Sequence, residues 1–411
     1  MSTRVAARCP TLFQKSITRS HSTLSIALVA GIATCALSLI ITHLAQVFSP
    51  AARPGGDFTV VLMAARALLG GHNPYAVIRS WATASDPGAA LYYPLPAVLV
   101  AVPLAWLPAA IAGPVAFGIS TGGLAGYLRA ANRPILPLLL SAPFLFAASA
   151  AQWAPFIMVM GLIPALSGFA IAKPNLGLAM FAYRPSWRGV AGGTALVALS
   201  FLILPSWLHD WRAAVSSTPF HRMPLRWPGG FIVLLALLRW RRAEARLLVV
   251  LACVPQFPFF YDQLLLWLIP DNEREALTLT WCSWLALALW LLFSSGYPSR
   301  EANLTTDAPY VIALCYIPCL IFVLRRPNVH SEPILLPPAS IEDHATVCDA
   351  DRDANSTRAI VIPLLHHRLL LLHLRLHDLH RLLHHRKLSR LTAVPLQPYP
   401  HRDRARHHCR R

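Results

Sequence analysis

The stretch "STLSIALVAGIATCALSLIITHLAQVF", residues 22–48, decides the fold class of this chain. It carries no lysine, arginine or acidic residue, and as a helix it is long enough to cross the roughly 30 Å hydrocarbon core of a membrane. Arg4, Arg8, Lys15 and Arg19 precede it, as they would in a signal peptide. However, the apolar run exceeds a signal core, and no convincing small-x-small cleavage site follows. We therefore predict a retained first span entering from the cytoplasm, after a cytoplasmic N-terminus at 1–21.

The composition extends this conclusion to most of the chain. Of 411 residues, 55% are hydrophobic and only 13% are charged, which is typical of a polytopic membrane protein rather than a soluble one. The net charge of +18 comes from short basic clusters between apolar runs, where orientation in the membrane explains them better than nucleic-acid binding. The eight cysteines form no CxxC pair. We expect no nucleic-acid partner, no metal and no cofactor.

Lysine and arginine near span ends mark the cytoplasmic face, and threading the chain on this rule predicts about ten to twelve crossings. The loops 49–90, 206–227 and 258–263 then face outward. On this count 91–108 crosses back, 111–128 crosses out again, and the arginines that follow lie outside, against the rule. We expect an all-α transmembrane helix bundle over 22–326.

Two regions leave alternatives open. Prolines break the apolar stretch 134–172, so its number of crossings is ambiguous. The segment 327–411 is rich in histidine and arginine, and its histidine pairs are able to bind metal. Since it lacks the periodicity of a packed element, we favour a disordered cytoplasmic tail with at most one amphipathic helix, resembling a translated alternative reading frame.

Asp57 is the first acidic residue of the chain, in the sequence "GGDF". The apolar residues after it recur at helical spacing, which predicts an amphipathic helix along the membrane surface. Aspartate is a favoured N-cap, and spacing alone favours that role. The alternative is a general base at the outer membrane boundary, with Gly55 and Gly56 allowing close backbone approach.

Other candidates carry structural alternatives of their own. Tyr92 and Tyr93 open the next apolar run, where an aromatic belt is the simpler interpretation. Gln152 is more often a helix–helix hydrogen-bonding residue than a ligand. Lys173, one of only three lysines, follows an apolar run and either extends to the interface or meets an anion such as phosphate.

His221 and Arg222 belong to an outer basic loop, "STPFHRMPLRWP". Two adjacent cationic side chains are able to hold a phosphate, although exposed basic loops are usually only solvated.

The order of motifs supplies a further expectation. "GGDF", "GHNPY", "YYPLPAVLVAVPLAWLP", "AQWAPF", "AIAKPNLGLAMF" and "PQFPFFYDQLLLWLIP" together resemble glycosyltransferase family 87 of the GT-C superfamily, over roughly residues 20–325. Each motif is short, so the resemblance rests on their order. It departs from the family at Ala151, where glycine is usual, and at Gln263, where histidine is frequent.

The resemblance implies transfer of a hexose, typically mannose, from a polyprenyl-phosphate sugar to a lipid or glycan acceptor. It implies that Asp57 is the catalytic base, that Lys173 contacts the donor, and that Tyr261 and Asp262 form the aromatic-acidic turn. The implied location is the plasma membrane, with the site on the extracytoplasmic face. A transporter or lipid flippase, or a non-catalytic relative, remains the alternative, because broken helices and intramembrane charge describe those proteins too.

Overall fold

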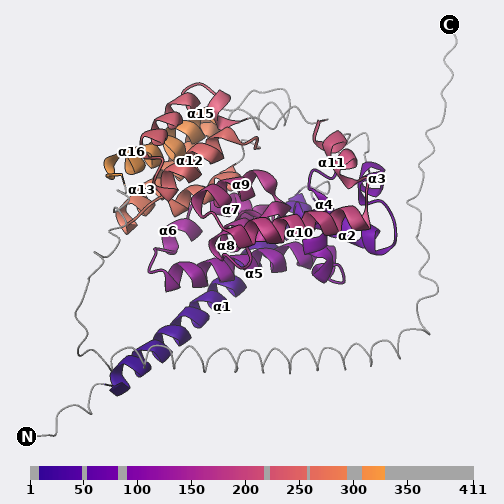
Figure 1. Ribbon diagram of the computed structural model, residues 1–411, viewed down its shortest axis with the longest axis horizontal. Coiled ribbons are helices and arrows are strands. Elements are labelled where there is room, and N and C mark those ends of the chain that lie inside the picture. The colour runs from indigo at the N-terminus through magenta and orange to yellow at the C-terminus, as the bar shows by residue number, and fades with distance from the viewer. Residues whose placement is uncertain are drawn as a thin grey trace, which may run out of the picture. The chain divides into compact units, whose positions relative to one another are not determined.

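A computed structural model gives the fold of the chain (Figure 1). It describes residues 9–48, 53–81, 90–216, 223–256, 260–293 and 308–328, all within one compact unit, Met1–His330. Every regular element of these residues is a helix, so the all-α prediction is confirmed. Of the proposed tail at 327–411, all but the first two residues lie outside the described residues.

The elements alternate α-helices with short 3-10 helices, labelled η, and one π-helical turn, η6. In chain order they are α1 (Cys9–Phe48), α2 (Phe58–Leu69), α3 (Pro74–Arg79), α4 (Leu95–Ala101), η1 (Val102–Leu104), α5 (Ala109–Ala130), α6 (Leu136–Leu139), α7 (Ala142–Ser149), α8 (Ala154–Leu162), η2 (Ser167–Ala172), α9 (Pro174–Tyr183), α10 (Trp187–Ile203), α11 (Trp207–Ser216), η3 (Pro224–Arg226), η4 (Gly230–Arg239), α12 (Ala243–Cys253), η5 (Phe260–Leu268), α13 (Glu273–Phe293), α15 (Ala308–Val311), η6 (Ile312–Tyr316) and α16 (Ile317–Arg325).

Several helices are long and apolar enough to cross a membrane, which indicates a membrane protein. Among the described residues there are four, Ser22–Phe48, α5, α13 and Ala308–Arg325. Two bent pairs, α7 with α8 at 110° and α10 with α11 at 101°, raise the number to six if each pair is one span. This is fewer than the ten to twelve crossings expected from the sequence, because many apolar runs form helices too short to span.

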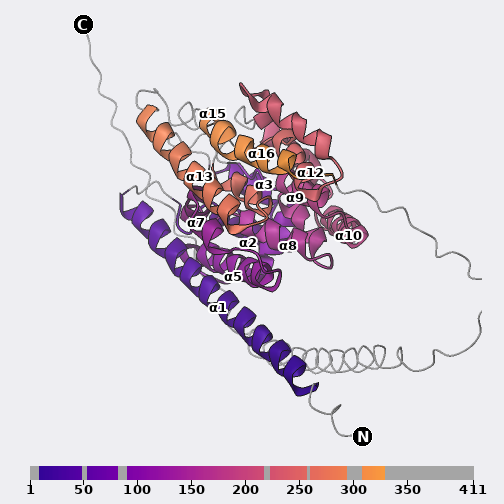
Figure 2. The ribbon, with the colours of Figure 1, turned by 90° about the vertical axis from the view of Figure 1, so that its left-hand side faces the viewer.

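Helices α1 and α5 pack closely through small residues. A Cβ on Gly118 would lie 2.6 Å from the Cβ of Cys35, and one on Gly122 would lie 2.7 Å from the carbonyl oxygen of Ala27. Small residues at four-residue spacing let two helix backbones approach in this way. Since later residues of α5 meet earlier residues of α1, the two helices are antiparallel and lie side by side (Figure 2).

This pairing corrects the threading of the second apolar run. The stretch 91–108 forms only α4 and η1, which together are too short to cross, so α5 is the helix that returns from the end of α1. Arg129 and Arg133 therefore lie at the same end as the start of α1. These two arginines therefore no longer depart from the rule that basic residues near span ends lie on the cytoplasmic side, where the start of α1 is expected.

Helix α2 begins and ends as its periodicity predicts, and it is largely covered by the rest of the protein. Eight of its twelve residues are buried. Arg66, its only charged residue, donates from Nε to the carbonyl oxygen of Ala105 at 2.8 Å and from Nη2 to that of Leu107 at 2.5 Å. Together with α3, α4 and α11, α2 forms the part of the structure on the right of Figure 1.

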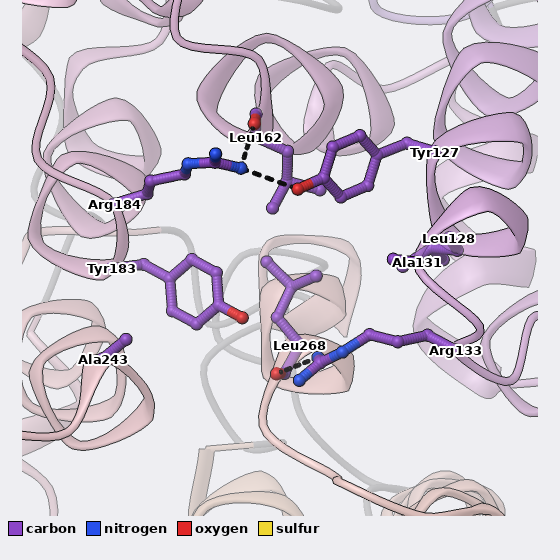
Figure 3. A pocket seen from close by; sticks show the side chains of 9 residues that line it. All are labelled: Tyr127, Leu128, Ala131, Arg133, Leu162, Tyr183, Arg184, Ala243 and Leu268. Carbon is purple, nitrogen blue, oxygen red and sulfur yellow. Dashed lines mark hydrogen bonds between the residues drawn. The ribbon is translucent and has the colours of Figure 1, made fainter. Parts of the chain in front are cut away.

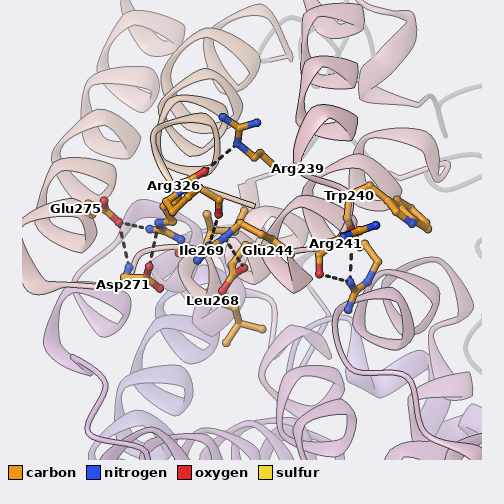
Figure 4. A network of polar contacts seen from close by, with 12 residues as sticks. Arg239, Trp240, Arg241, Glu244, Leu268, Ile269, Asp271, Glu275 and Arg326 are labelled. Carbon is orange, nitrogen blue, oxygen red and sulfur yellow. Dashed lines mark hydrogen bonds and ion pairs between the residues drawn. The ribbon is translucent and has the colours of Figure 1, made fainter. Parts of the chain in front are cut away.

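Arginine side chains concentrate at the opposite part, which we call the arginine end (Figure 4). Arg326 donates to the carbonyl oxygen of Ile269 at 2.9 Å and pairs with Asp271 at 2.9 Å and with Glu275. Further arginines satisfy the free carbonyl groups of helix ends. They are Arg133 to Leu268 (2.7 Å), Arg184 to Leu162 (2.7 Å), Arg246 to Ala182 (2.8 Å) and Arg239 to Arg326 (2.8 Å).

Candidate functional site

The loop before α2 is built for close backbone contact. Gly55 and Gly56 both have φ of +72°, a conformation that favours glycine. A Cβ on Gly55 would lie 2.1 Å from the carbonyl oxygen of Ala109, and one on Gly56 would lie 2.5 Å from that of Ala150. The amide of Asp57 donates to the same Ala150 oxygen at 2.9 Å. The two glycines thus fix Asp57 against the end of α7.

The carboxylate of Asp57 does not cap α2. Asp57 occupies the N-cap position, but its backbone is already helical and its side chain makes no capping hydrogen bond. Instead, Gln152 donates from Nε2 to Oδ2 of Asp57 at 2.5 Å. Asp57 itself stays partly exposed, whereas Gln152 is buried. The capping role that spacing favoured is therefore wrong, and the carboxylate is held by an amide from the loop between α7 and α8.

Aromatic rings surround this pair. Trp153 lies 5.4 Å from Phe58, 5.7 Å from Tyr93 and 5.4 Å from Phe156, measured between ring centroids. Nε1 of Trp153 and Oε1 of Gln152 are buried and have no hydrogen-bond partner among the described residues. Buried polar atoms are normally paired, so these two atoms are exceptions within the described part of the chain.

A second cluster centres on Lys173, between η2 and α9. Its Nζ lies 2.5 Å from Oδ1 of Asp262 and 5.1 Å from the ring centroid of Tyr261. The side chains of Lys173 and Asp262 are 12% and 2% exposed, so this is a largely buried ion pair. Lys173 therefore does not extend to an interface, as one interpretation held, and its charge is already matched by a carboxylate.

Tyr93 connects the two clusters electrostatically. Burial raises the pKa of its hydroxyl well above the ordinary value, and the negative charges of Asp57 and Asp262 raise it further, against a smaller opposing effect of Arg53. The hydroxyl therefore stays protonated at neutral pH and is a hydrogen-bond donor. The charges of both carboxylates therefore act on the same side chain.

The structure describes only some of the remaining predicted site residues. Tyr92 accepts a hydrogen bond at its carbonyl oxygen from Nε1 of Trp211 at 2.9 Å, which ties its segment to α11. His221 and Arg222 lie outside the described residues. The two cavities described for the molecule are lined by neither Asp57 nor Lys173.

Sequence reasoning missed a third polar contact in this part of the molecule. Asn73 caps α3 by accepting from the amide of Tyr75 at 2.9 Å, and it donates from Nδ2 to Oδ2 of Asp210 at 2.9 Å. The Asn-Pro step predicts the cap, but nothing local predicts the contact with α11. Asp57, Asp210 and Asp262, with the amide and ammonium groups that hold them, are called the aspartate region below.

The comparisons with known proteins supply no relative for this site. No protein-family model, no curated protein and no solved structure matches the chain.

Proposed function

We propose that this protein is a polytopic membrane glycosyltransferase that transfers a hexose, mannose in the first instance, from a polyprenyl-phosphate sugar to a lipid or glycan acceptor. The observation that carries the proposal is the contact between Gln152 and Asp57, in which a partly exposed carboxylate is oriented by a buried amide instead of capping its helix. A carboxylate held in this way is suited to accept a proton from a bound hydroxyl.

The reaction needs a base and a stabilised leaving group. Asp57 takes the proton of the acceptor hydroxyl, whose oxygen attacks the anomeric carbon while the bond from that carbon to the phosphate oxygen breaks. The electron pair leaves with the polyprenyl phosphate, and the configuration at the anomeric carbon inverts. A positioned general base contributes about 10²–10⁴-fold to such a rate.

The departing phosphate requires hydrogen-bond donors and positive charge. Tyr93 supports the proposal as a hydrogen-bond donor that stays protonated, because burial and the charges of both carboxylates raise the pKa of its hydroxyl. Lys173 contributes only if its ammonium is shared between Asp262 and the phosphate, since the pair with Asp262 cancels its charge. His221 and Arg222 are the further cations proposed for donor binding, with Tyr92 and Tyr261 as flanking aromatic contacts.

The distribution of basic residues supports an orientation. Basic residues favour the cytoplasmic face, so the arginine end faces the cytoplasm and the aspartate region faces outward, across the plasma membrane. Polyprenyl-phosphate sugars present their sugar at that outer surface, which fits a GT-C type bundle that needs no nucleotide-sugar site.

A direct transfer assay tests this function. Membranes containing the protein are incubated with polyprenyl-phosphate [³H]mannose, and lipid and glycan fractions are separated to follow the label. We expect label to appear in an acceptor fraction only when the protein is present, with inverted anomeric configuration in the product. Label that stays on the polyprenyl phosphate across donor sugars and acceptor extracts would overturn the proposal.

A lipid flippase is the second candidate, favoured by the two bent helix pairs, α7 with α8 and α10 with α11. A flippase would move the intact labelled donor between leaflets without breaking the glycosidic bond. The same assay in sealed vesicles, with periodate oxidation of outward-facing sugars, distinguishes the two, because only the transferase changes the chemical identity of the labelled lipid.

A further inference from the structure

A cavity of about 250 Å³ lies at the arginine end, remote from Asp57 in sequence and lined by none of the residues of the proposed active site. It is enclosed by the C-terminal end of α5, the C-terminal ends of α8 and α9, the start of α12 and the end of η5 (Figure 3). Its lining residues are Tyr127, Leu128, Ala131, Arg133, Leu162, Tyr183, Arg184, Ala243 and Leu268. Arg184 is exposed, so the cavity is reachable from the surface.

Two guanidinium groups enter this cavity from opposite walls, as Figure 3 shows. Arg133 donates to the carbonyl oxygen of Leu268 at 2.7 Å. Arg184 donates through Nη1 to the hydroxyl of Tyr127 and to the carbonyl oxygen of Leu162, both at 2.7 Å. These partners are uncharged, so they orient the two guanidinium groups without neutralising them.

Carboxylates neutralise the charges of Arg133 and Arg184 only weakly. Asp271 lies 3.7 Å from Nη2 of Arg133, but it is closer to Nε of Arg326, at 2.9 Å. Glu244 lies 3.7 Å from Arg242. Arg184 makes no ion pair with any carboxylate in the described part of the chain. The cavity therefore contains one guanidinium group, that of Arg184, without a carboxylate partner among the described residues, and a second, that of Arg133, with only a distant one.

Two hydroxyl groups add further hydrogen-bond donors to the cavity. In Figure 3 the hydroxyl of Tyr183 points into the cavity toward Arg133. Tyr127 accepts from Arg184, which leaves its own proton free to be donated inward. Two guanidinium groups and two phenolic hydroxyls converge on one space whose other walls are leucine and alanine. Such a set binds a compact oxyanion, because arginine pairs with phosphate oxygens in a bidentate manner.

We propose that this cavity binds a phosphate group, held by Arg133 and Arg184 with Tyr183 as a further donor. Basic pockets between transmembrane helices bind phospholipid head groups, and a soluble phosphate offers the same chemistry. The proposal is independent of the proposed glycosyl transfer, because none of its residues belongs to the aspartate region.

Thermal unfolding of the purified protein in neutral detergent tests the proposal with two probes. One series adds sodium phosphate against sodium chloride of equal ionic strength, and the other adds phosphatidylglycerol against phosphatidylcholine in mixed micelles. A ligand that binds only the folded state raises the unfolding midpoint with its concentration. We expect a saturable rise with at least one probe. Phosphate alone identifies a soluble ligand, and phosphatidylglycerol alone identifies a lipid head group.

Variants assign the effect to the cavity. Arg184→Gln and Arg133→Gln should each abolish the rise, and Arg241→Gln should retain it, because Arg241 is exposed at the same end but does not line the cavity. Should an arginine variant not fold, Ala243→Phe keeps both arginines and fills the space. No saturable rise with either probe, or a rise that survives Arg184→Gln or Ala243→Phe, would overturn the proposal.

Discussion

The arginine end and the aspartate region use charge in opposite ways. At the arginine end, side chains such as Arg326 reach carbonyl groups and two carboxylates at once, and Arg246 and Arg239 satisfy the ends of other helices. In the aspartate region, the amide of Gln152 donates to Asp57 and the ammonium of Lys173 donates to Asp262. The first arrangement fixes helices to one another, whereas the second presents a carboxylate at a loop.

We infer from this difference that the arginine end serves mainly structure and the aspartate region mainly function. Arginines that bind several groups at once, as Arg326 does, make the arginine end a structural network, in which losing such a side chain leaves several groups unsatisfied. A carboxylate on a glycine-fixed loop contributes little to packing but is accessible to a substrate, and functional residues are frequently carried on such loops. Changes in the two parts should therefore affect different measurements.

The largest expected effect is on transfer in the aspartate region. Asp57→Asn removes the proton acceptor, so label transfer from polyprenyl-phosphate mannose should fall by about 10²–10⁴-fold. The unfolding midpoint in detergent should stay close to that of the unchanged protein, because Asp57 makes no capping hydrogen bond that the substitution could remove.

Asp210→Asn is the matched control for Asp57→Asn. Asp210 also accepts a hydrogen bond from a side-chain amide, that of Asn73 at 2.9 Å, but it lies outside the aromatic cluster. We expect its transfer rate to remain within a few-fold of the unchanged protein. Equal losses in the two variants would show that any aspartate of this region matters only for structure.

The next largest effect is on stability at the second cluster. Lys173→Met leaves Asp262 buried without its cation, which should lower the free energy of unfolding by about 3–5 kcal/mol. The double variant Lys173→Met, Asp262→Asn should recover much of this loss, and a double-mutant cycle by chemical denaturation measures the coupling. A single variant as stable as the unchanged protein would show that the pair contributes nothing.

At the arginine end, Arg326→Gln removes a hydrogen bond to Ile269 and both ion pairs. The free energy of unfolding should fall by about 1–3 kcal/mol, the usual range for hydrogen bonds to charged groups, while transfer per folded molecule stays unchanged. Arg325→Gln, at the exposed neighbouring position, should change neither quantity. A transfer defect in Arg326→Gln at full folding would break the proposed division between structure and chemistry.

The smallest effect concerns Ala151, which has φ of 46° although it is not glycine. Ala151→Gly loses a buried methyl group, at about 0.8 kcal/mol, but relieves about 1–2 kcal/mol of left-handed strain. Stability by chemical denaturation should therefore change by less than about 1 kcal/mol. Ala147→Gly, equally buried but inside α7, should lose more. An equal loss in both variants would argue against strain at Ala151.

Apolar length and periodicity predicted much of the fold. Helix α5 extends the predicted run 111–128 by two residues at each end, and Ser22–Phe48 is a helix long enough to span, as the first apolar run predicts. The error at 91–108 arose because apolar composition does not distinguish a spanning helix from the short buried pair α4 and η1. Spacing of Gly118, Gly122 and Gly126 carried the missing signal, since glycines four residues apart mark a helix-packing face.

The candidate site was predictable as residues but not as contacts. The sequence named Asp57, Gln152, Lys173 and Asp262 separately, and the structure joins them into two pairs. The partners of each pair are about 90 residues apart, and no local pattern specifies which distant side chain meets which. The positive φ of Ala151 was not predictable either, because no local pattern specifies it.

The close pairing of α1 with α5 also implies a delay during biosynthesis, between the synthesis of the first helix and that of its partner. At about 5–20 residues per second, the ribosome needs about 5–20 seconds to add the roughly 90 residues that separate Gly31 from Gly122. During that interval α1 has been made but its glycine-lined partner has not, so its small-residue face meets lipid or the insertion machinery. The arrival of α5 then closes a helical hairpin around which the later helices assemble.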